Sequence, residues 1–463
     1  MNKTVVLNIV GLCKALIGEH TPFLKHWIAK GNHRVIENVL PAVTCSVQAT
    51  YLTGKYPNQH GIVGNGWYDR TECEVKFWKQ SNKLVQASKI WEEARRWKSH
   101  FTACNMFWWY NMYSSVDYSV TPRPQYWADG RKVPDCYAHP PELRDKLQKA
   151  LGTFPLFDFW GPGASIRSSQ WIAQACKLVE EWHSPTLTLI YLPHLDYNLQ
   201  RYGVSSPVIH KDLQQIDEVC KDLVTFYESR GATVIVLSEY GITDVNNPIH
   251  INRLLRQKGW LQVRREHHQT ELLDAGASKA FAVADHQIAH VYLNDVSLLP
   301  QVKELLEQTP GIEQVLDRQG KIQHHLDHER AGDLIAVADA NSWFTYYYWL
   351  NDKHAPDFAR LVEIHKKPGY DPVELFTDPA KPFVPLQIAW KLFKRKLGFR
   401  TLMDVIPLDA SLVRGSHGRI VEQIDFKPIV AMSQADCLPP EKICLPNQVY
   451  DIIFQSLKQG IKK

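Results

Sequence analysis

One hydroxyl draws attention early in the chain, because Thr44 lies where an apolar, Pro-bounded run gives way to a helical pattern. The stretch PAVTCSVQATYLTGKYPNQHGIVGN runs from Pro41 to Asn65. Gly54 is placed as the C-cap of a helix that Pro57 prevents from continuing. Thr44 therefore falls at the helix N-terminus, where capping is one interpretation, since Thr is a favoured N-cap residue. The other interpretation is a nucleophile, because free N–H groups and the helix dipole attract a phosphate to that position.

Three further polar residues have types and positions that could act together with this hydroxyl. Asp196 follows the apolar run PTLTLIYLP, and Glu239 follows the run ATVIVL. His417 lies between small residues in the segment GSHG, where an imidazole can approach a ligand closely. A hydroxyl at a helix start, two carboxylates at strand ends and a late histidine are the groups that a metal-assisted displacement needs.

The elements that must position these groups follow a strand–helix–strand rhythm. Continuous β-rich runs at 185–193 and 232–237 are typical of strands buried on both faces. The segment 210–231 between them has helical spacing and ends in a glycine. This pattern predicts an α/β fold with a mainly parallel sheet flanked by helices. Chemistry in such sheets gathers at the carboxyl ends of the strands, where Asp196 and Glu239 are expected.

The pattern changes between residues 281 and 338, where strand, helix, strand and strand signals follow one another. We expect a small α+β insert there, with 1–280 and 339–463 forming the main domain. The insert carries Asp285, His286 and His290, and alternation predicts that both histidines lie on one strand face. For these residues, and for His365 further on, ordinary hydrogen-bonded roles are favoured over metal ligation.

The composition is that of a soluble globular protein, since 44% of the 463 residues are hydrophobic and 22% are charged. A net charge of +4 is too small to indicate nucleic-acid binding. The basic cluster KLFKRKLGFR, which ends at Arg400, could touch an anionic surface, although a solvated helix face is favoured. No apolar run has the length of a signal peptide or a membrane span, so a cytoplasmic protein is expected. Nine scattered cysteines without a CxxC pair indicate neither a disulfide framework nor a cysteine zinc site.

The segment around Thr44 resembles the nucleophile segment of the type I phosphodiesterase and nucleotide pyrophosphatase family, within the alkaline phosphatase superfamily. That family shows Pro-x-x-Thr, a helix, Thr-Gly-x-x-Pro, His-Gly-Ile and an Asn, and the matching residues are Thr44, Thr53, Gly54, Pro57, His60, Gly61, Ile62 and Asn65. Three shorter segments, DYNLQRYG, SEYGIT and GSHG, resemble later family motifs and follow in the family order.

The resemblance implies an alkaline-phosphatase-like fold and a threonine alkoxide that attacks phosphorus between two metal ions. Asn65 and the backbone N–H of Cys45 would hold the phosphoryl oxygens, and Tyr240 is expected beside the same substrate. Two ions a few ångströms apart would activate the nucleophile and neutralise charge in the transition state. Asp196 and His417 carry over directly as ligands of one ion.

Four positions depart from the family pattern. Val10 stands where the family has its first metal-binding aspartate, and Gln200 stands where it has a histidine. Glu239 and Tyr240 replace an aspartate and a histidine of the fourth strand. Valine cannot coordinate a metal ion, and a histidine-rich zinc pair is therefore not expected.

The oxygen-rich set that remains changes the expected metal. Asp196, Gln200 and Glu239 together with His417 favour Mg²⁺, Mn²⁺ or Ca²⁺ over Zn²⁺. The second metal position keeps only Glu239 and Thr44, which are too few to hold an ion tightly. We expect no more than one tightly bound divalent ion (Mg, Mn, Ca or Zn) per chain, with Asp196 and His417 as its main ligands.

Aromatic residues are concentrated between Phe107 and Lys132, together with Arg123 and Arg131. One interpretation is a pocket in which a planar group stacks and an arginine holds a phosphate. Core packing is the other interpretation, and the sequence does not favour either.

Two functions are compatible with these features. The first is a phosphoric ester hydrolase of the phosphodiesterase type, with Thr44 as covalent nucleophile, a modified metal centre and a phosphorylated small molecule as substrate. The second is a pseudoenzyme that binds a phosphorylated ligand or partner without hydrolysis. The intact Thr44 segment favours the first and the substituted ligand positions favour the second, and the oligomeric state is not predicted.

Overall fold

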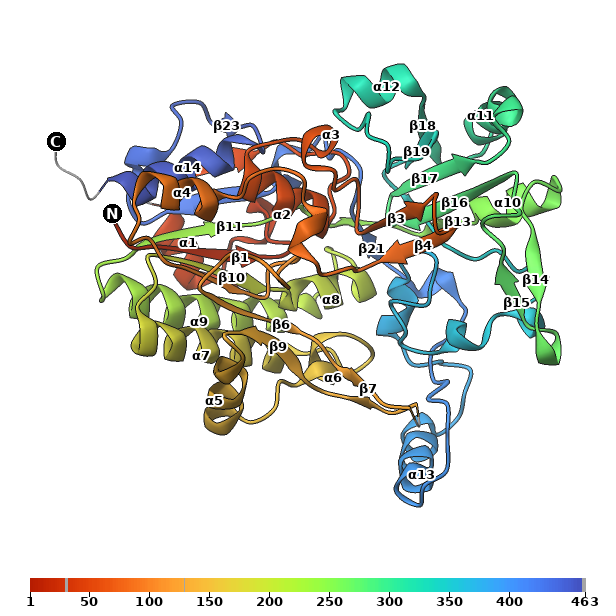
Figure 1. The fold of residues 1–463 in the computed structure, drawn as a ribbon, viewed down its shortest axis with the longest axis horizontal. Coiled ribbons are helices and arrows are strands. Elements are labelled where there is room, and N and C mark those ends of the chain that lie inside the picture. Colours follow the sequence, from red (N-terminus) through yellow and green to blue (C-terminus); the bar gives the residue numbers. More distant parts are fainter. Residues whose placement is uncertain (30–31, 129, 460–463) are drawn as a thin grey trace.

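The main sheet of the computed structural model has nine strands, and the structure describes residues 1–29, 32–128 and 130–459 (Figure 1). In order across the sheet these are β23 (Ile443–Cys444), β2 (His33–Ile36), β22 (Ile429–Met432), β11 (Thr233–Leu237), β1 (Thr4–Ile9), β10 (Leu187–Leu192), β5 (Ala103–Met106), β6 (Tyr118–Pro122) and β9 (Cys136–His139). The central run from β11 to β6 is parallel, and β22 and β9 are antiparallel to their neighbours.

The register of the parallel strands β1, β10 and β11 brings together the residues that follow them. In the central pairs Ile9 lies opposite Leu192, and Asn8 lies opposite Leu237. Strands β1, β10 and β11 are buried along their whole length because helices cover both faces of the sheet. Their carboxyl ends therefore reach one edge of the sheet together, as expected for an α/β fold.

The helices form two layers on this sheet (Figure 1). On one side lie α1 (Pro22–Ile28), α5 (Pro141–Leu151), α7 (Ile166–His183), α8 (His194–Tyr202) and α9 (Ile209–Glu228). On the other side lie α2 (Thr44–Thr53), α4 (Ile90–Trp97) and α14 (Gln448–Lys458). This arrangement confirms the predicted mainly parallel sheet flanked by helices.

A second, antiparallel sheet lies beside the first and has its own hydrophobic core. Its strands, in order, are β16 (Ala280–Asp285), β17 (Ile288–Leu293), β19 (Leu334–Ala338) and β18 (Ile312–Leu316). Helices α10 (Ile251–Gln257), α11 (Leu299–Glu307) and α12 (Arg318–Gln323) accompany it. These strands account for the expected α+β insert, whereas the core also draws on residues before 281 and after 338, so the division into domains stays a prediction.

Short elements complete the described chain. Two-stranded pairs are β3 (Gly66–Asp69) with β4 (Glu74–Phe77), β7 (Gln125–Tyr126) with β8 (Lys132–Val133), β12 (Thr243–Asp244) with β21 (Gly415–Ser416), β13 (Asn247–Ile249) with β20 (Ser342–Phe344), and β14 (Val263–Arg265) with β15 (Glu271–Leu273). The remaining α-helices of the described residues are α3 (Pro57–His60), α6 (Leu156–Phe159) and α13 (Val384–Lys396).

The segment around His286 differs from its prediction. The run predicted as one strand is a hairpin of β16 and β17 that turns at His286 and Gln287. His286 has a φ of 61°, and this left-handed conformation ends the strand. His286 and His290 therefore do not share a strand face, contrary to the alternation argument.

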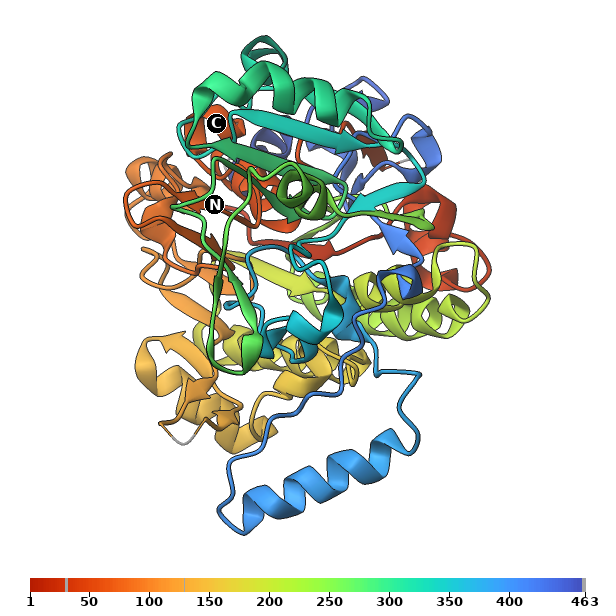
Figure 2. The ribbon, with the colours of Figure 1, turned by 90° about the vertical axis from the view of Figure 1, so that its right-hand side faces the viewer.

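Helix α13 stands apart from the rest of the molecule. Figure 2 shows it projecting from the body on two extended connections. Within the described residues, no helix has both the length and the apolar character that crossing a bilayer would take.

Candidate active site

Thr44 is the first residue of α2, and its side chain does not cap the helix. Val43 occupies the N-cap position and has no side-chain capping group, and Asn65 Oδ1 accepts from the Cys45 N–H in the first turn. At the other end Gly54 adopts the left-handed conformation, with a φ of 65°, as the sequence predicted. The buried Thr44 hydroxyl instead lies 3.2 Å from the hydroxyl of Tyr240. The hydroxyl is thus free for a role other than capping.

Tyr240 links this hydroxyl to a carboxylate. It lies in the loop that follows β11, and its hydroxyl donates to Oδ1 of Asp196 at 3.4 Å. Its ring stacks on the imidazole of His417 at 3.5 Å, with an angle of 8° between the planes. Tyr240 therefore occupies the space between the nucleophile candidate and two of the expected metal ligands.

Asp196 lies in the first turn of α8 and is buried. Its Oδ2 accepts a hydrogen bond from Gln200 Nε2 at 2.8 Å, since residues four apart share a helix face. The Oε1 of Gln200 is in turn occupied by the hydroxyl of Tyr370 at 2.9 Å. Burial raises the pKa of Asp196 to about 7, although the hydrogen bonds from Gln200 and Tyr240 lower it.

Glu239 is held by two amides. Its Oε1 accepts from Asn8 Nδ2 at 2.5 Å and from Gln48 Nε2 at 2.6 Å. Its Oε2 has no hydrogen-bond partner among the described residues. Burial raises the pKa of Glu239 to about 8, and hydrogen bonds from Gln48, Asn8 and Thr44 lower it. Gln48 lies four residues after Thr44 in α2, so the same helix positions the hydroxyl and the carboxylate.

His417 is a buried, neutral imidazole. Its Nδ1 lies 2.8 Å from the carbonyl oxygen of Ala42, which fixes the proton on that nitrogen. Its Nε2 lies 3.9 Å from Oδ1 of Asp196 and has no hydrogen-bond partner among the described residues. Burial is the main cause that lowers the pKa of His417 well below 6.5.

Asn65 and Cys45, expected to hold phosphoryl oxygens, contact each other. The backbone N–H of Cys45 donates to Asn65 Oδ1 at 3.0 Å. The backbone N–H and the side-chain amide of Asn65 donate to the carboxylate of Asp285 at 2.8 and 3.0 Å. This network joins α2 to the end of β16, and burial raises the pKa of Asp285 to about 6.

Asp285 and His286 lie at the site, although the sequence argument set them aside. Nδ1 of His286 lies 2.9 Å from Asp285 Oδ1, and its ring lies 3.8 Å from that of His417 and 3.6 Å from that of Tyr370. A hairpin prediction for 280–293, in place of one long strand, would have placed both residues at a turn, where the structure has them buried.

The other two histidines that were set aside have structural partners. His290 uses both ring nitrogens, at 2.9 Å from the Val63 carbonyl oxygen and 3.1 Å from the Gly332 amide. His365 lies 3.3 Å from the carbonyl oxygen of Phe77.

The donor set does not fit a metal pair. Val10 is buried and apolar, and the described residues contain no group of three or more His, Cys, Asp or Glu side chains placed to hold one ion. Amide N–H groups already satisfy Oδ2 of Asp196 and Oε1 of Glu239. Two groups of atoms remain. Oε2 of Glu239 is unpaired but stands alone, whereas Asp196 Oδ1 and His417 Nε2 lie 3.9 Å apart, a separation that suits two ligands of a single ion.

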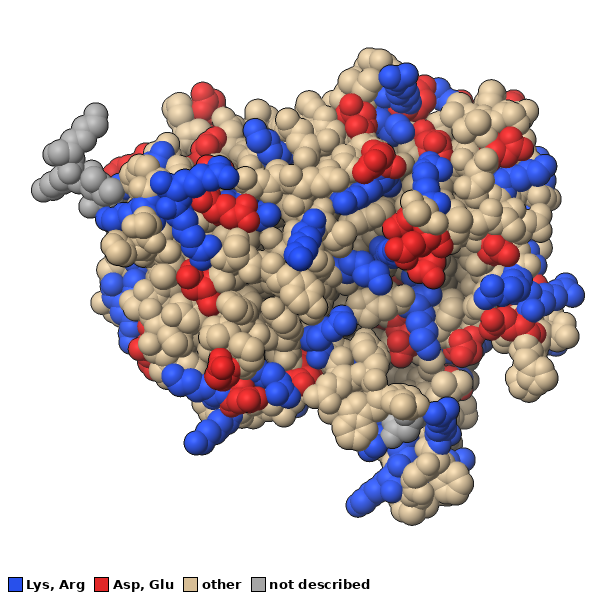
Figure 3. Space-filling view, in the orientation of Figure 1, with Lys and Arg blue, Asp and Glu red and all other residues tan. Residues whose placement is uncertain are grey.

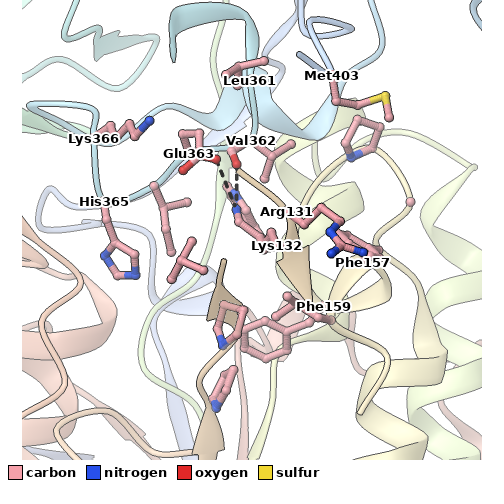
Figure 4. A pocket seen from close by; sticks show the side chains of 18 of the residues that line it. Arg131, Lys132, Phe157, Phe159, Leu361, Val362, Glu363, His365, Lys366 and Met403 are labelled. Atoms are coloured by element: carbon pink, nitrogen blue, oxygen red, sulfur yellow. Dashed lines mark hydrogen bonds and ion pairs between the residues drawn. The ribbon is translucent and has the colours of Figure 1, made fainter. Parts of the chain in front are cut away.

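Part of the site borders a cavity of about 1050 Å³. Thr44, Asp196, Tyr240, His286 and Tyr370 lie along it, and its further walls are largely aromatic, with Trp78, Trp109, Tyr126, Trp127, Phe157, Phe159 and Trp160. Figure 4 shows one part of it, where the neighbours Arg131 and Lys132 come from one segment and Lys366 from another. Lys132 is fixed there, since its Nζ donates to the Val362 carbonyl at 2.9 Å and lies 3.8 Å from Glu363.

The aromatic segment 107–132 contributes to both pocket and core. Phe107, Trp108 and Tyr110 are buried in the hydrophobic clusters. Trp109 and Arg131 line the cavity instead.

The nine-stranded sheet and the threonine at its edge define an alkaline-phosphatase-like protein. The family model of type I phosphodiesterase / nucleotide pyrophosphatase matches residues 4–371, and the chain belongs to this family. This confirms the resemblance drawn from the Thr44 segment, and the family is one of hydrolases acting on phosphoric esters.

Individual relatives are distant. An uncharacterized pyrophosphatase/phosphodiesterase of Schizosaccharomyces pombe is 25% identical over 225 residues, which are 46% of this chain and 38% of the yeast protein. Mouse ectonucleotide pyrophosphatase/phosphodiesterase 5, in an inactive threonine-to-alanine form in complex with AMP, is 13% identical, with a TM-score of 0.59. The aligned parts are 99% of this chain and 95% of the mouse chain.

Phosphonoacetate hydrolase of Sinorhizobium meliloti, in complex with phosphonoformate, is 14% identical with a TM-score of 0.60. The alignment covers 99% of this chain and 96% of that enzyme. At such identities these two structures establish a shared fold.

Proposed function

We propose that this protein is a phosphodiesterase-type hydrolase that uses Thr44 as its nucleophile. The observation that carries the proposal is the Thr44 hydroxyl, which starts α2, caps nothing and lies on the cavity. The N-terminus of a helix favours a negatively charged phosphoryl group at this point. The cavity volume suits a substrate with a nucleotide-sized organic group, such as the AMP found in the mouse structure.

In the proposed reaction Thr44 Oγ1 forms a bond to phosphorus while the bond from phosphorus to the leaving ester oxygen breaks. The hydroxyl proton passes to the oxygen of Tyr240 as the phenol proton moves to Asp196, along contacts of 3.2 and 3.4 Å. The ester oxygen leaves as an alkoxide or aryloxide. Water then attacks phosphorus and breaks its bond to Thr44 Oγ1, and the proton returns from Asp196 through Tyr240 to restore the hydroxyl. A divalent ion held by Asp196 and His417 would supply positive charge to the site in place of this proton transfer, because it would occupy the same oxygen of Asp196.

The test compares Thr44→Ala with Thr44→Ser on a chromogenic aryl phosphodiester. We expect Thr44→Ala to lose all measurable turnover and Thr44→Ser to keep part of it, because serine retains the hydroxyl. Thr53→Ala is the matched control, since Thr53 lies in the same helix and donates only to the Ala49 carbonyl. A phosphorylated Thr44 in mass spectra of quenched reactions would support the nucleophile directly, and full turnover by Thr44→Ala would refute it.

The second candidate is a pseudoenzyme that binds a phosphorylated ligand without cleaving it. It is favoured by Val10, which cannot bind a metal ion, and by the side-chain amides of Gln48 and Gln200, which donate hydrogen bonds to the carboxylates of Glu239 and Asp196. Calorimetric titration with AMP and with inorganic phosphate distinguishes the two, because the pseudoenzyme binds a phosphorylated ligand while no ester is hydrolysed at any metal concentration.

A further inference from the structure

The segment 381–402, which we name the α13 arm, presents apolar side chains to solvent. Leu386, Trp390, Phe393 and Leu397 are 68%, 56%, 50% and 59% exposed. Their spacing of three and four residues places them on one stripe of α13. Trp390 and Phe393 stack with 5.7 Å between their ring centres. An exposed apolar stripe of this kind indicates an interaction surface.

The stripe cannot turn inward, because the opposite face of the arm is fastened. Lys391 Nζ donates to the Leu402 carbonyl at 2.8 Å and pairs with the carboxylate of Asp404. Arg395 donates to the Thr401 carbonyl at 3.0 Å, and Val384 is buried. These contacts hold the arm's return segment against the inner face, and Figure 2 shows α13 at the far end of a projection from the body of the molecule.

The arm is also strongly basic. Between Asp378 and Asp404 the chain has no acidic residue, and its basic residues are Lys381, Lys391, Lys394, Arg395, Lys396 and Arg400. Figure 3 shows blue and tan atoms at the tip of this projection. Lys394 lies over the ring of Trp390 at 5.1 Å, so positive charge borders the apolar stripe directly.

We propose that the α13 arm docks on an anionic lipid bilayer, with α13 lying in the plane of the interface. Basic residues beside exposed Trp, Phe and Leu are the composition of an interfacial helix. With 13 residues α13 is too short to span a bilayer, which takes roughly 20. A second copy of the chain would bring the same positive charge to the contact, whereas an anionic lipid surface supplies the opposite charge.

Docking in this orientation would bring the cavity close to the membrane surface. Leu392, Phe399 and Leu402 of the arm line the same cavity as Thr44. The proposal does not depend on hydrolysis, because it concerns the outer face of the arm and is tested by binding alone.

The test is cosedimentation of the full chain with vesicles of phosphatidylcholine, and with vesicles of equal parts phosphatidylcholine and phosphatidylglycerol. We expect binding to the anionic vesicles that weakens as salt is raised. Trp390→Glu combined with Phe393→Glu should abolish it. Lys394→Gln combined with Lys396→Gln should lower the partition coefficient by about 30-fold, since each basic residue near such a surface strengthens binding about fivefold.

Val296→Glu is the matched control, because Val296 is also exposed and apolar but lies before α11, away from the arm. Urea unfolding of every variant separates lost binding from lost folding. The proposal is overturned if the wild type ignores anionic vesicles, or if arm and control variants bind equally well. Light scattering that shows a dimer abolished by the Trp390 and Phe393 changes, without vesicle binding, would assign the stripe to a second copy instead.

Discussion

At the scale of single residues, amide side chains stand where the family resemblance led us to expect metal ligation. Asn8 and Gln48 donate to Glu239, and Gln200 donates to Asp196, so both buried carboxylates have neutral donors. A buried carboxylate without a neighbouring cation needs such hydrogen-bond donors, because burying it without a partner costs free energy. The loss of an aspartate at Val10 and the gain of these amides are therefore consistent with each other.

The valine at position 10 and the amides bound to Glu239 and Asp196 predict the metal content of the protein. After exhaustive dialysis we expect elemental analysis to find no more than one divalent ion per chain, because Asp196 Oδ1 and His417 Nε2 lie close enough to share an ion, whereas the unpaired Oε2 of Glu239 has only the Thr44 hydroxyl as a second ligand. Asp196→Asn should remove any such ion by weakening one of two ligands. Two zinc ions per chain, at full occupancy, would contradict this and would bring other residues of the site into the coordination.

Tyr240 offers the sharper test at this scale. Tyr240→Phe removes only the hydroxyl that joins Thr44 to Asp196 and keeps the stacking on His417. We expect kcat to fall by about 10- to 100-fold with little change in KM, since the lost hydrogen bonds are worth about 1.5–3 kcal/mol. Tyr227→Phe is the control, because Tyr227 donates to the Cys176 carbonyl far from the site. An unchanged kcat would remove Tyr240 from the proton path.

At the scale of elements, the sequence predicted the parts that depend on local pattern. The β-rich runs before Asp196 and Glu239 gave the central parallel strands, and Gly54 and Pro57 gave the end of α2. The hairpin turn at His286 was not predicted, because the polar residues 285–287 between the two apolar stretches include no Gly, Asn or Pro to mark a turn. Its contact with His417 depends on long-range packing, which periodicity does not contain.

The loop that carries Tyr240 depends on a close approach at the next residue. A Cβ at Gly241 would overlap the carbonyl oxygen of Phe426, so Gly241→Ala must displace the loop. We expect a loss of about 1–3 kcal/mol in the free energy of unfolding, as for other overpacked sites, and a lower kcat. Gly18→Ala is the control, since nothing lies within 4 Å of a Cβ there, and it should change the free energy of unfolding by less than about 0.5 kcal/mol. Equal urea midpoints for the two variants would refute the close approach.

At the scale of the whole molecule, the site lies where two hydrophobic cores meet. Thr44, Glu239 and Tyr240 come from elements of the main sheet, and Asp285 and His286 come from the end of β16 in the second sheet. Asp285 makes the connection by accepting both N–H groups of Asn65, which in turn accepts from the start of α2. A shift of the second sheet would therefore move the start of α2, where Thr44 lies, through the carboxylate of Asp285.

Asp285→Ala tests this connection. We expect it to lower the free energy of unfolding by about 2–3 kcal/mol, because two hydrogen bonds to a buried carboxyl group are lost. It should also lower kcat, because Asn65 loses its orientation beside Cys45. Asp217→Ala is the matched control: Asp217 is a buried carboxylate that accepts from the Phe23 and Leu24 amides at 2.9 Å, away from the cavity. It should cost similar stability and leave kcat unchanged. If both variants lose stability and neither loses kcat, Asp285 supports the fold alone and the two cores are not coupled at the site.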